Sequence, residues 1–250
     1  MKRIESAQNP KVKQWRKLHT RKEREKSGTF LVEGYHLVEE ALKNKQQISE
    51  IILGENTNIP KNWNLNGVDL YLVTEAILKA LAETETSQGV FAVYRHHEYK
   101  DEQQWKRVLL LDAVQDPGNL GTIIRTADAA GMDGIILGEG TVDAYNAKTL
   151  RSSQGSIFHI PVVRGNIRDW IETLKSQSIP VYGTALENAL PFKEVESQPA
   201  FALMLGNEGK GVSAEHLAGT DQNLYIPIHG HAESLNVAIA AGILLYHLRG

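Results

Sequence analysis

The half of the chain that begins at Arg107 alternates short apolar runs with helical patterns. Its first run, residues 108–111, is wholly apolar, which is typical of a strand buried on both faces. Further strands are predicted at 134–137, 180–184, 201–205 and 224–227, and helices at 120–130, 167–176 and 234–248. Strands that alternate with helices predict a mostly parallel sheet with helices on both faces. Because such sheets bind ligands at the carboxyl ends of their strands, the residues that follow each strand are the first candidates for a site.

Residues 1–95 predict a second, smaller α/β domain. Strands are expected at 29–34, 48–53, 68–73 and 89–94, and helices at 35–44 and 75–82. Thr74 is the expected cap of the helix at 75–82. Residues 96–106 are polar and lack periodicity, so we expect a linker there. The sequence therefore predicts a small N-terminal α/β domain at 1–95, a linker, and a parallel-sheet domain at 107–250.

Basic residues are concentrated at the N-terminus. Residues 1–26 contain ten lysines and arginines against three acidic residues, whereas the whole chain has a net charge of −3. Val12, Trp15, Leu18 and His19 recur at helical spacing, which predicts one amphipathic helix with its apolar side packed and its basic side outward. Dense positive charge on an otherwise acidic chain indicates a contact with a polyanion such as nucleic acid, or a surface that only confers solubility.

Composition excludes several other classes of protein. With 250 residues, 42% of them hydrophobic and 23% charged, the chain has a globular composition. It has no cysteine, which removes disulfide frameworks, cysteine-ligated zinc, iron–sulfur clusters and thiol nucleophiles. The longest apolar run, 237–246, is about half the length of a membrane span, and the polar N-terminus does not resemble a signal peptide. We therefore expect a cytoplasmic protein without a membrane segment.

The first candidate site follows the strand at 108–111. Asp112 ends that strand, a Pro-Gly turn follows, and Asn119 stands where a helix N-cap belongs. Backbone N–H groups at the start of such a helix suit an anion. Arg125, inside the helix, can hold a phosphate through two hydrogen bonds. The plainer interpretation is an ordinary capped helix with a surface arginine.

Three glycines stand among residues 206–211, directly after the strand at 201–205. Glycines at this spacing let the backbone approach a ligand closely. The segment is not a P-loop, because Lys210 is followed by Gly211 rather than by serine or threonine. A loose dinucleotide pattern at 209–214 is discounted, since that pattern normally opens the first βαβ unit. A plain turn between a strand and a helix is the other interpretation.

The third candidate follows the strand at 224–227. Ser234 is the expected N-cap of the last helix, and Asn236 lies just inside that helix. His229 and His231 could be metal ligands, but no clear third ligand and no cysteine accompany them, so no metal is expected. No Gly-x-Ser-x-Gly elbow occurs, so a Ser-His-Asp hydrolase is not expected.

Taken in order, these segments resemble the SpoU family of S-adenosylmethionine-dependent RNA ribose 2′-O-methyltransferases, of the SPOUT superfamily. The matching segments are Asn-Leu-Gly-Thr-Ile-Ile-Arg at 119–125, Leu-Gly-Asn-Glu-Gly-Lys-Gly at 205–211, Ile-Pro at 226–227 and Ser-Leu-Asn-Val at 234–237. The resemblance covers about residues 107–248. The front half looks like the ribosomal-protein-like RNA-binding domain that many members carry. His229 and His231 depart from the family's third motif.

The resemblance implies a parallel sheet whose C-terminal segment threads through a loop as a deep trefoil knot, which general rules of topology would exclude. It also implies a homodimer, for which the helix at 237–248 is the expected interface, and S-adenosylmethionine bound in a bent form within the knot. The residues implied to hold the cofactor are Thr184, Ala185, Leu205, Gly206, Asn207, Gly211, Ile226, Ile228, Ser234 and Leu235.

The resemblance further implies catalytic roles for Arg125, Asn119, Glu208, Ser234 and Asn236. The family's proposed base is the arginine, yet an arginine side chain is effectively always charged. Three sources of the base therefore stay open: the arginine, a phosphate or water that the arginine assists, and Glu208. RNA is expected to bind Lys11, Lys13, Arg16, Lys17, Arg21 and Lys22.

Two other classes of function stay open at this level. A small-molecule enzyme with a Rossmann-like nucleotide site predicts dinucleotide binding without RNA, and a noncatalytic RNA-binding protein predicts RNA binding without methyl transfer. Among RNA substrates, the separate N-terminal domain favours large-subunit ribosomal RNA over transfer RNA.

Overall fold

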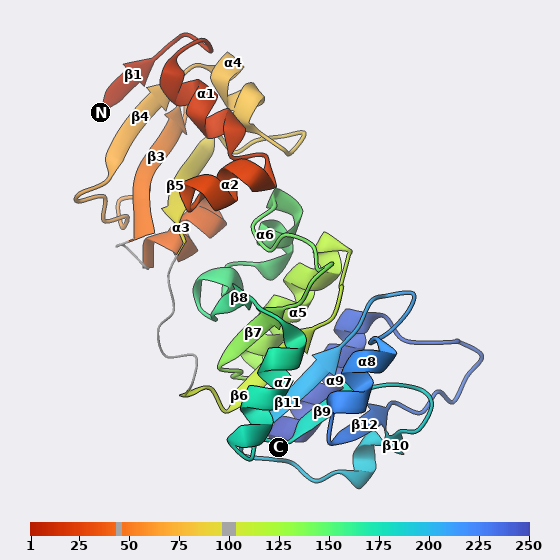
Figure 1. The fold of residues 1–250 in the computed structure, drawn as a ribbon. Coiled ribbons are helices and arrows are strands. Elements are labelled where there is room, and N and C mark those ends of the chain that lie inside the picture. Colours follow the sequence, from red (N-terminus) through yellow and green to blue (C-terminus); the bar gives the residue numbers. More distant parts are fainter. Residues whose placement is uncertain (44–46, 97–103) are drawn as a thin grey trace. The chain divides into compact units, whose positions relative to one another are not determined.

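The computed structural model describes residues 1–43, 47–96 and 104–250 (Figure 1). The chain forms two compact units: Met1–Glu98 together with Tyr145–Phe158, and Tyr99–Ala144 together with His159–Gly250. Most of the predicted linker lies outside the described residues. Within the described ranges, none of the helices is long and apolar enough to span a bilayer.

The first unit is built on a five-stranded mixed sheet in the order β1-β4-β3-β5-β2. Its strands are β1 (Lys2–Ile4), β2 (Thr29–Glu33), β3 (Ile48–Gly54), β4 (Asp69–Val73) and β5 (Val90–Arg95). β4 runs parallel to β1 and β3, whereas β5 runs antiparallel to β2 and β3. The four strands predicted in this half are confirmed, and β1 is an addition that the sequence reasoning missed.

Helices cover this sheet. They are α1 (Pro10–Lys17), α2 (Arg21–Ser27), α3 (Tyr35–Lys43), α4 (Glu75–Leu81) and α6 (Ala147–Ser153). One core joins buried residues of α1 and α4 to the sheet, with Trp15 packed edge-on against Tyr71 at 5.1 Å between ring centroids. The segment 145–158 packs with this unit although it lies inside the range predicted for the second domain. No prediction was made for α6.

The prediction of one basic helix over the N-terminal segment is wrong. α1 ends near Leu18, and α2 follows after a turn. The buried Arg24 of α2 reaches back across that turn and donates from Nη1 to the carbonyl oxygen of Leu18 over 2.6 Å. That hydrogen bond satisfies a carbonyl that the end of α1 leaves open. The predicted packing side is confirmed, since Val12, Trp15 and Leu18 are all buried.

The second unit is built on a seven-stranded sheet in the order β10-β12-β9-β11-β6-β7-β8, and every pairing is parallel. Its strands are β6 (Arg107–Leu111), β7 (Gly134–Leu137), β8 (Val162–Arg164), β9 (Val181–Thr184), β10 (Leu190–Pro191), β11 (Phe201–Leu205) and β12 (Gln222–Tyr225). The predicted parallel sheet is therefore confirmed.

Helices lie on both faces of this sheet (Figure 1). α7 (Ile167–Ser176) and α8 (Ala214–Gly219) contact each other and β9, while α5 (Pro117–Ala129) and α9 (Val237–Arg249) pack together, with α9 against β11. In β6, Val108 and Leu110 join the core beneath α7, and Leu109 and Leu111 are equally buried. This is the strand buried on both faces that the apolar run predicted.

The structure corrects two predicted helix caps and confirms the position of a third. Asp116, not Asn119, caps α5, and its carboxylate accepts from the Asn119 N–H over 2.9 Å, because Pro117 starts the helix one turn earlier. Asn236, not Ser234, caps α9 by accepting from the Ala238 N–H over 2.9 Å. Thr74 stands at the start of α4, but its side chain accepts no hydrogen bond from the helix. Because Asp116 caps α5, the Asn119 side chain is available for other contacts.

Candidate cofactor pocket and catalytic cluster

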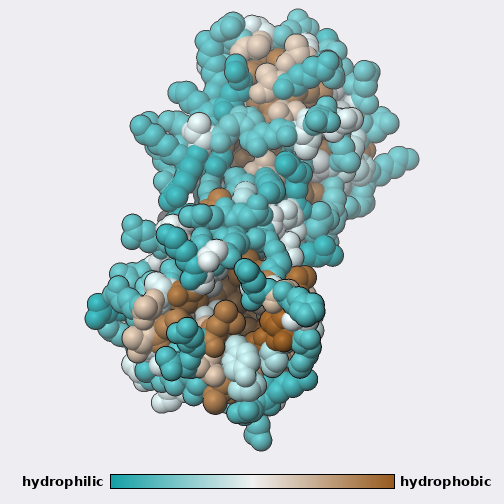
Figure 2. All heavy atoms as spheres, turned by 90° about the vertical axis from the view of Figure 1, so that its right-hand side faces the viewer, coloured by the Kyte–Doolittle hydropathy of each residue, from teal (hydrophilic) through white to brown (hydrophobic). Residues whose placement is uncertain are grey.

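A cavity of about 790 Å³ lies at the carboxyl ends of β9, β11 and β12. Its volume is within the range of small-molecule sites. All ten residues predicted to hold a cofactor line it: Thr184, Ala185, Leu205, Gly206, Asn207, Gly211, Ile226, Ile228, Ser234 and Leu235. On the face shown in Figure 2, apolar side chains of the second unit gather around a hollow. The ends of β9, β11 and β12 therefore meet around one cavity, whereas the first candidate segment, which follows β6, does not line it.

The glycine loop at 206–211 closes on itself. Asn207 and Gly211 exchange both backbone hydrogen bonds, at 3.0 and 2.9 Å, and Asn207 Oδ1 accepts from the N–H groups of Gly209 and Lys210 at 3.0 Å each. A Cβ on Gly206 would overlap the backbone of Gly211 and Val212. The close approach that Gly206 permits is thus one between two parts of this chain, and it shapes the wall of the cavity.

Glu208 is held by hydrogen bonds at the tip of this loop. Its carboxylate accepts from the N–H groups of Gln115 and Asp116 at 3.0 and 2.9 Å, and from Asn119 Nδ2 at 3.1 Å. Burial by itself would raise the pKa of Glu208, but the bonds from Asn119, Asp116 and Gln115 outweigh it and hold the pKa below its ordinary value. A carboxylate with a lowered pKa and occupied lone pairs is a weak base. The geometry therefore favours a positioning role for Glu208.

Asn119 connects Glu208 to α9. The Asn236 Nδ2 group donates to Asn119 Oδ1 over 2.9 Å, while Asn119 Nδ2 donates to Glu208. Three of the five predicted catalytic residues thus form one hydrogen-bonded row, Asn236–Asn119–Glu208. This row ties the start of α5 to the glycine loop and to the start of α9.

Arg125 and Ser234 lie outside this row. Arg125 is exposed on α5, and its side chain forms no hydrogen bond or ion pair in the described part of the chain. Ser234 is exposed at the cavity wall and likewise has no hydrogen-bond partner among the described residues. The structure therefore leaves both side chains available to a substrate.

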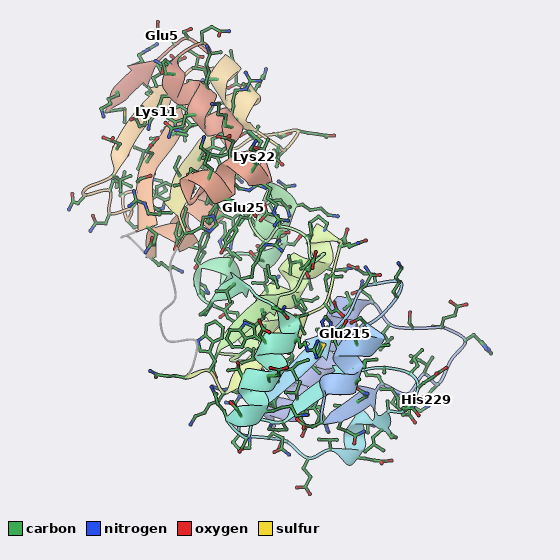
Figure 3. All side chains as sticks on the ribbon, viewed as in Figure 1. Glu5, Lys11, Lys22, Glu25, Glu215 and His229 are labelled. Carbon is green, nitrogen blue, oxygen red and sulfur yellow. The ribbon has the colours of Figure 1, made fainter. Side chains whose placement is uncertain are left out.

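His229 and His231 are both exposed on the loop after β12, where Figure 3 marks His229. Across residues 1–43, 47–96 and 104–250, no group of three or more histidine and acidic side chains is placed to hold a metal ion. The structure gives the two histidines no ligand partners within those ranges.

The six predicted RNA-binding residues lie on α1 and α2, where Figure 3 marks Lys11 and Lys22. Two of them form ion pairs and four do not. Lys11 is half-buried and pairs with Glu50 at 2.6 Å, and Arg21 pairs with Glu25 at 2.7 Å. The other four are exposed and form no ion pair within the described ranges: Lys13, Arg16, Lys17 and Lys22. These four are the cations best suited to an external anion.

Sequence reasoning missed several residues that line the cavity. Glu187 and Asn188 follow Ala185 in the loop after β9, and Asn223 and Tyr225 belong to β12. The rule that ligands bind at strand ends could have found the first two, because they follow the predicted strand at 180–184. The β12 residues carry no such signal, since they lie within a strand.

The fold and the cavity define a class of protein. The model of the SpoU rRNA Methylase family matches residues 106–246, and the model of the MRM3-like substrate binding domain matches residues 9–92. The chain belongs to the SpoU family. It is an S-adenosylmethionine-dependent RNA ribose 2′-O-methyltransferase, which removes the noncatalytic and the small-molecule alternatives.

Individual relatives resemble the chain over its whole length. It is 56% identical to the 23S rRNA (guanosine(2553)-2′-O)-methyltransferase RlmP of Bacillus subtilis, over 100% of both chains. The AdoMet-bound rRNA methyltransferase of Sinorhizobium meliloti is 32% identical, with a TM-score of 0.89 over 99% of this chain and 97% of that one. The SpoU methyltransferase AviRb of Streptomyces viridochromogenes, in complex with AdoMet, is 29% identical, with a TM-score of 0.85 over 97% of each chain.

Proposed function

We propose that this enzyme methylates the ribose 2′-OH of a guanosine in 23S ribosomal RNA, at the position equivalent to 2553. The observation that carries the proposal is the 56% identity to RlmP across the whole of both chains. It includes the N-terminal unit, which matches a substrate-binding domain. Because ribosomal RNA is the proposed substrate, we also infer that the enzyme is cytoplasmic.

The cavity of the second unit fits S-adenosylmethionine. Its wall combines apolar side chains such as Leu205 and Leu244 with backbone groups of the glycine loop, where Gly206 leaves no room for a Cβ. An apolar cavity with a few polar groups suits a nucleoside ligand. When bound, the cofactor supplies a methyl group on a positively charged sulfur. The ten predicted residues hold it, with Asn207 acting through the loop rather than through its side chain.

The remaining chemistry belongs to the chain and the RNA. The row Asn236–Asn119–Glu208 fixes the start of α5, and α5 carries Arg125. An arginine on an exposed helix face can hold a phosphate through two hydrogen bonds. Arg125 therefore places the ribose and favours loss of the 2′-OH proton to the phosphate or to water, with Ser234 beside the cavity as a further contact. The lowered pKa of Glu208 argues against Glu208 as the base.

RNA binding by the first unit rests on Lys13, Arg16, Lys17 and Lys22, which are exposed and unpaired in the described ranges. Contacts to phosphates release counterions, so this binding depends strongly on salt. Lys11 and Arg21 contribute less, because Glu50 and Glu25 already neutralise them.

A homodimer formed through α9 completes the proposal. Ile239 and Tyr246 are 56% and 58% exposed, and they stand seven residues apart on one face of the helix. Apolar side chains in such a stripe favour burial against a partner, and a second copy of this chain is the partner that the family resemblance implies. Light scattering should give twice the monomer mass for the wild type and the monomer mass for Ile239→Asp. The trefoil knot implied by the same resemblance stays a prediction.

The substrate is tested with methyl-labelled S-adenosylmethionine and separate pools of unmodified 23S ribosomal RNA, assembled large subunits and transfer RNA. The RNA is digested to nucleosides after incubation. Label on the ribose of guanosine from ribosomal RNA supports the proposal, in free RNA or in particles. Label that appears in transfer RNA alone contradicts it.

A further inference from the structure

Two loops of the second unit are joined along their length beside the cavity. Residues 112–116 follow β6 and residues 206–213 follow β11, and these neighbouring parallel strands end at the same edge of the sheet. Glu208 binds the backbone of the first loop, and Asn207 Nδ2 donates to the Ala113 carbonyl oxygen over 3.0 Å. Asp112 makes a third connection, and it is not among the residues predicted to hold the cofactor or to act in catalysis.

Asp112 is a buried carboxylate, 7% exposed, at the end of β6. Its Oδ2 atom accepts from the Ser213 N–H over 2.8 Å and from His216 Nδ1 over 2.9 Å. Burial would raise the pKa of Asp112, but the bonds from Ser213 and His216 hold the pKa below its ordinary value. A buried charge is tolerated only when it is bonded in this way. Asp112 therefore grips the far end of the glycine loop and the first turn of α8.

That far end forms part of the cavity wall. Val212 precedes Ser213, and Ala214 and Leu217 of α8 follow it, and all three of these neighbours line the cavity. Glu208 binds Asn119 at the other end of the joined loops, on the side of α5. The two carboxylates thus hold one loop at two points, one facing the cofactor cavity and one facing the helix of Arg125.

We propose that Asp112, acting through Ser213 and His216, is a positioning residue that holds the cofactor-binding wall in its competent shape. The inference rests on the proposed assignment of the cavity to S-adenosylmethionine. Asp112 sets the affinity for the cofactor, whereas Glu208 sets turnover. Loss of Asp112 leaves the Ser213 N–H and His216 Nδ1 without their shared acceptor and frees this end of the glycine loop. The cofactor Kd should therefore rise roughly tenfold, a change of about 1.4 kcal/mol.

The chain offers a matched control at the other end of the same strand. Asp133 accepts from the N–H groups of Lys106 and Arg107 at 2.9 and 2.8 Å and pairs with the Arg107 guanidinium at 3.1 Å. Like Asp112, it accepts from the backbone and from a basic side chain, but it directly precedes β7, bonds the start of β6 and does not line the cavity. Asp133→Ala should reduce thermal stability and leave the affinity for the cofactor unchanged.

The experiment is calorimetric titration of full-length variants with S-adenosylhomocysteine, together with thermal unfolding and steady-state kinetics. We expect Asp112→Ala to raise both Kd and the KM for the cofactor, with kcat at saturation within about threefold of wild type. Asp112→Asn should recover most of the affinity through its amide oxygen. His216→Ala should raise Kd several-fold. A Kd for Asp112→Ala within twofold of wild type overturns the proposal. If Asp112→Ala does not fold, unchanged affinity in His216→Ala overturns it instead.

One more variant separates this proposal from the assignment of the cavity. Gly206→Ala places a methyl group against the loop backbone, so it should abolish binding. If Gly206→Ala binds S-adenosylhomocysteine like wild type, the cavity is not the cofactor site and the proposed function of these residues is wrong. If Gly206→Ala loses binding while Asp112→Ala and His216→Ala keep it, only the role of Asp112 is wrong.

Discussion

The Nδ2 group of Asn236 donates to Oδ1 of Asn119 over 2.9 Å, and this bond joins the cap of α9 to the first turn of α5. The two residues are 117 positions apart in the chain. Each side chain also makes a second hydrogen-bonded contact. Asn236 caps its helix, and Asn119 donates to Glu208. The cavity wall and the helix of Arg125 are therefore coupled through a pair of amides.

Asn236→Asp separates the two tasks of Asn236. A carboxylate keeps the cap on α9, so thermal stability should stay close to wild type. It cannot donate to Asn119, so the start of α5 loses its connection and kcat should fall up to about 100-fold, as misplacement by an ångström can cause. Single-turnover methylation and thermal unfolding check this pair of results. Asn236→Ala removes both the cap on α9 and the bond to Asn119, so it should lose stability as well as activity. An Asn236→Asp enzyme with full activity would show that the bond between Asn236 and Asn119 has no part in positioning.

Arg125→Ala should abolish methyl transfer and leave cofactor affinity unchanged, because Arg125 does not line the cavity. Arg125→Lys should recover little, since an ammonium group lacks the two-bond geometry of a guanidinium. Titration with S-adenosylhomocysteine beside a methylation assay measures both quantities. A loss of cofactor affinity in Arg125→Ala would contradict this division of labour.

Acid should unfold the second unit as its bonded carboxyls are protonated. The pKa values of Glu208 and Asp112 lie below their ordinary values of 4.5 and 3.8 in the folded protein. A group with a lowered folded pKa adds stability above its unfolded pKa and loses that contribution as the pH falls through the folded value. The free energy of unfolding should therefore be flat from pH 7 down to about 4.5 on this account and fall below it. Urea titrations at a series of pH values test this, and Glu208→Gln should show a shallower fall. If the free energy of unfolding falls equally steeply with pH in the wild type and in Glu208→Gln, Glu208 does not contribute to the acid sensitivity.

Replacing Lys13, Arg16, Lys17 and Lys22 by alanine should weaken RNA binding and flatten its dependence on salt. Removing one phosphate-binding cation lowers the slope of log K against log salt by about 0.7–0.9. The control is the double variant Lys11→Ala/Arg21→Ala, which removes cations that Glu50 and Glu25 already neutralise. Filter binding over a series of salt concentrations compares the quadruple variant with the double variant. Equal effects of the two variants would mean that exposure does not select the RNA contacts.

Most of the second unit could be predicted from its sequence because its strands are apolar on both faces. Residues 108–111 and 201–205 read as buried strands without any knowledge of their partners, and the helix at 167–176 is predicted to the residue. The short edge elements carried no such pattern, so β8, β10 and α8 were missed. The three candidate segments follow from strand ends, which a parallel sheet brings to one edge, whereas the cofactor-binding residues and the catalytic roles come from the family resemblance.

What the sequence could not show was which group bonds to which. Because asparagine favours the N-cap position, the sequence predicts Asn119 as the cap of α5. In the structure Asp116, which precedes a proline, caps the helix and leaves the Asn119 amide free to bind Glu208. The apolar spacing that continues through Leu18 predicts one helix over the basic segment. In the structure the buried side chain of Arg24 bridges the turn between α1 and α2, and apolar spacing does not reveal such a contact of a charged side chain.

The proposed target nucleotide can be tested by mapping the methyl group in full-length, unmodified 23S ribosomal RNA after incubation with the enzyme and S-adenosylmethionine. A 2′-O-methyl group blocks alkaline cleavage of the RNA chain at the modified ribose. We expect one new resistant position, at the guanosine equivalent to 2553 of the relative's substrate, and none with Arg125→Ala. A methyl group on a base, or a resistant ribose at a different nucleotide, would contradict it.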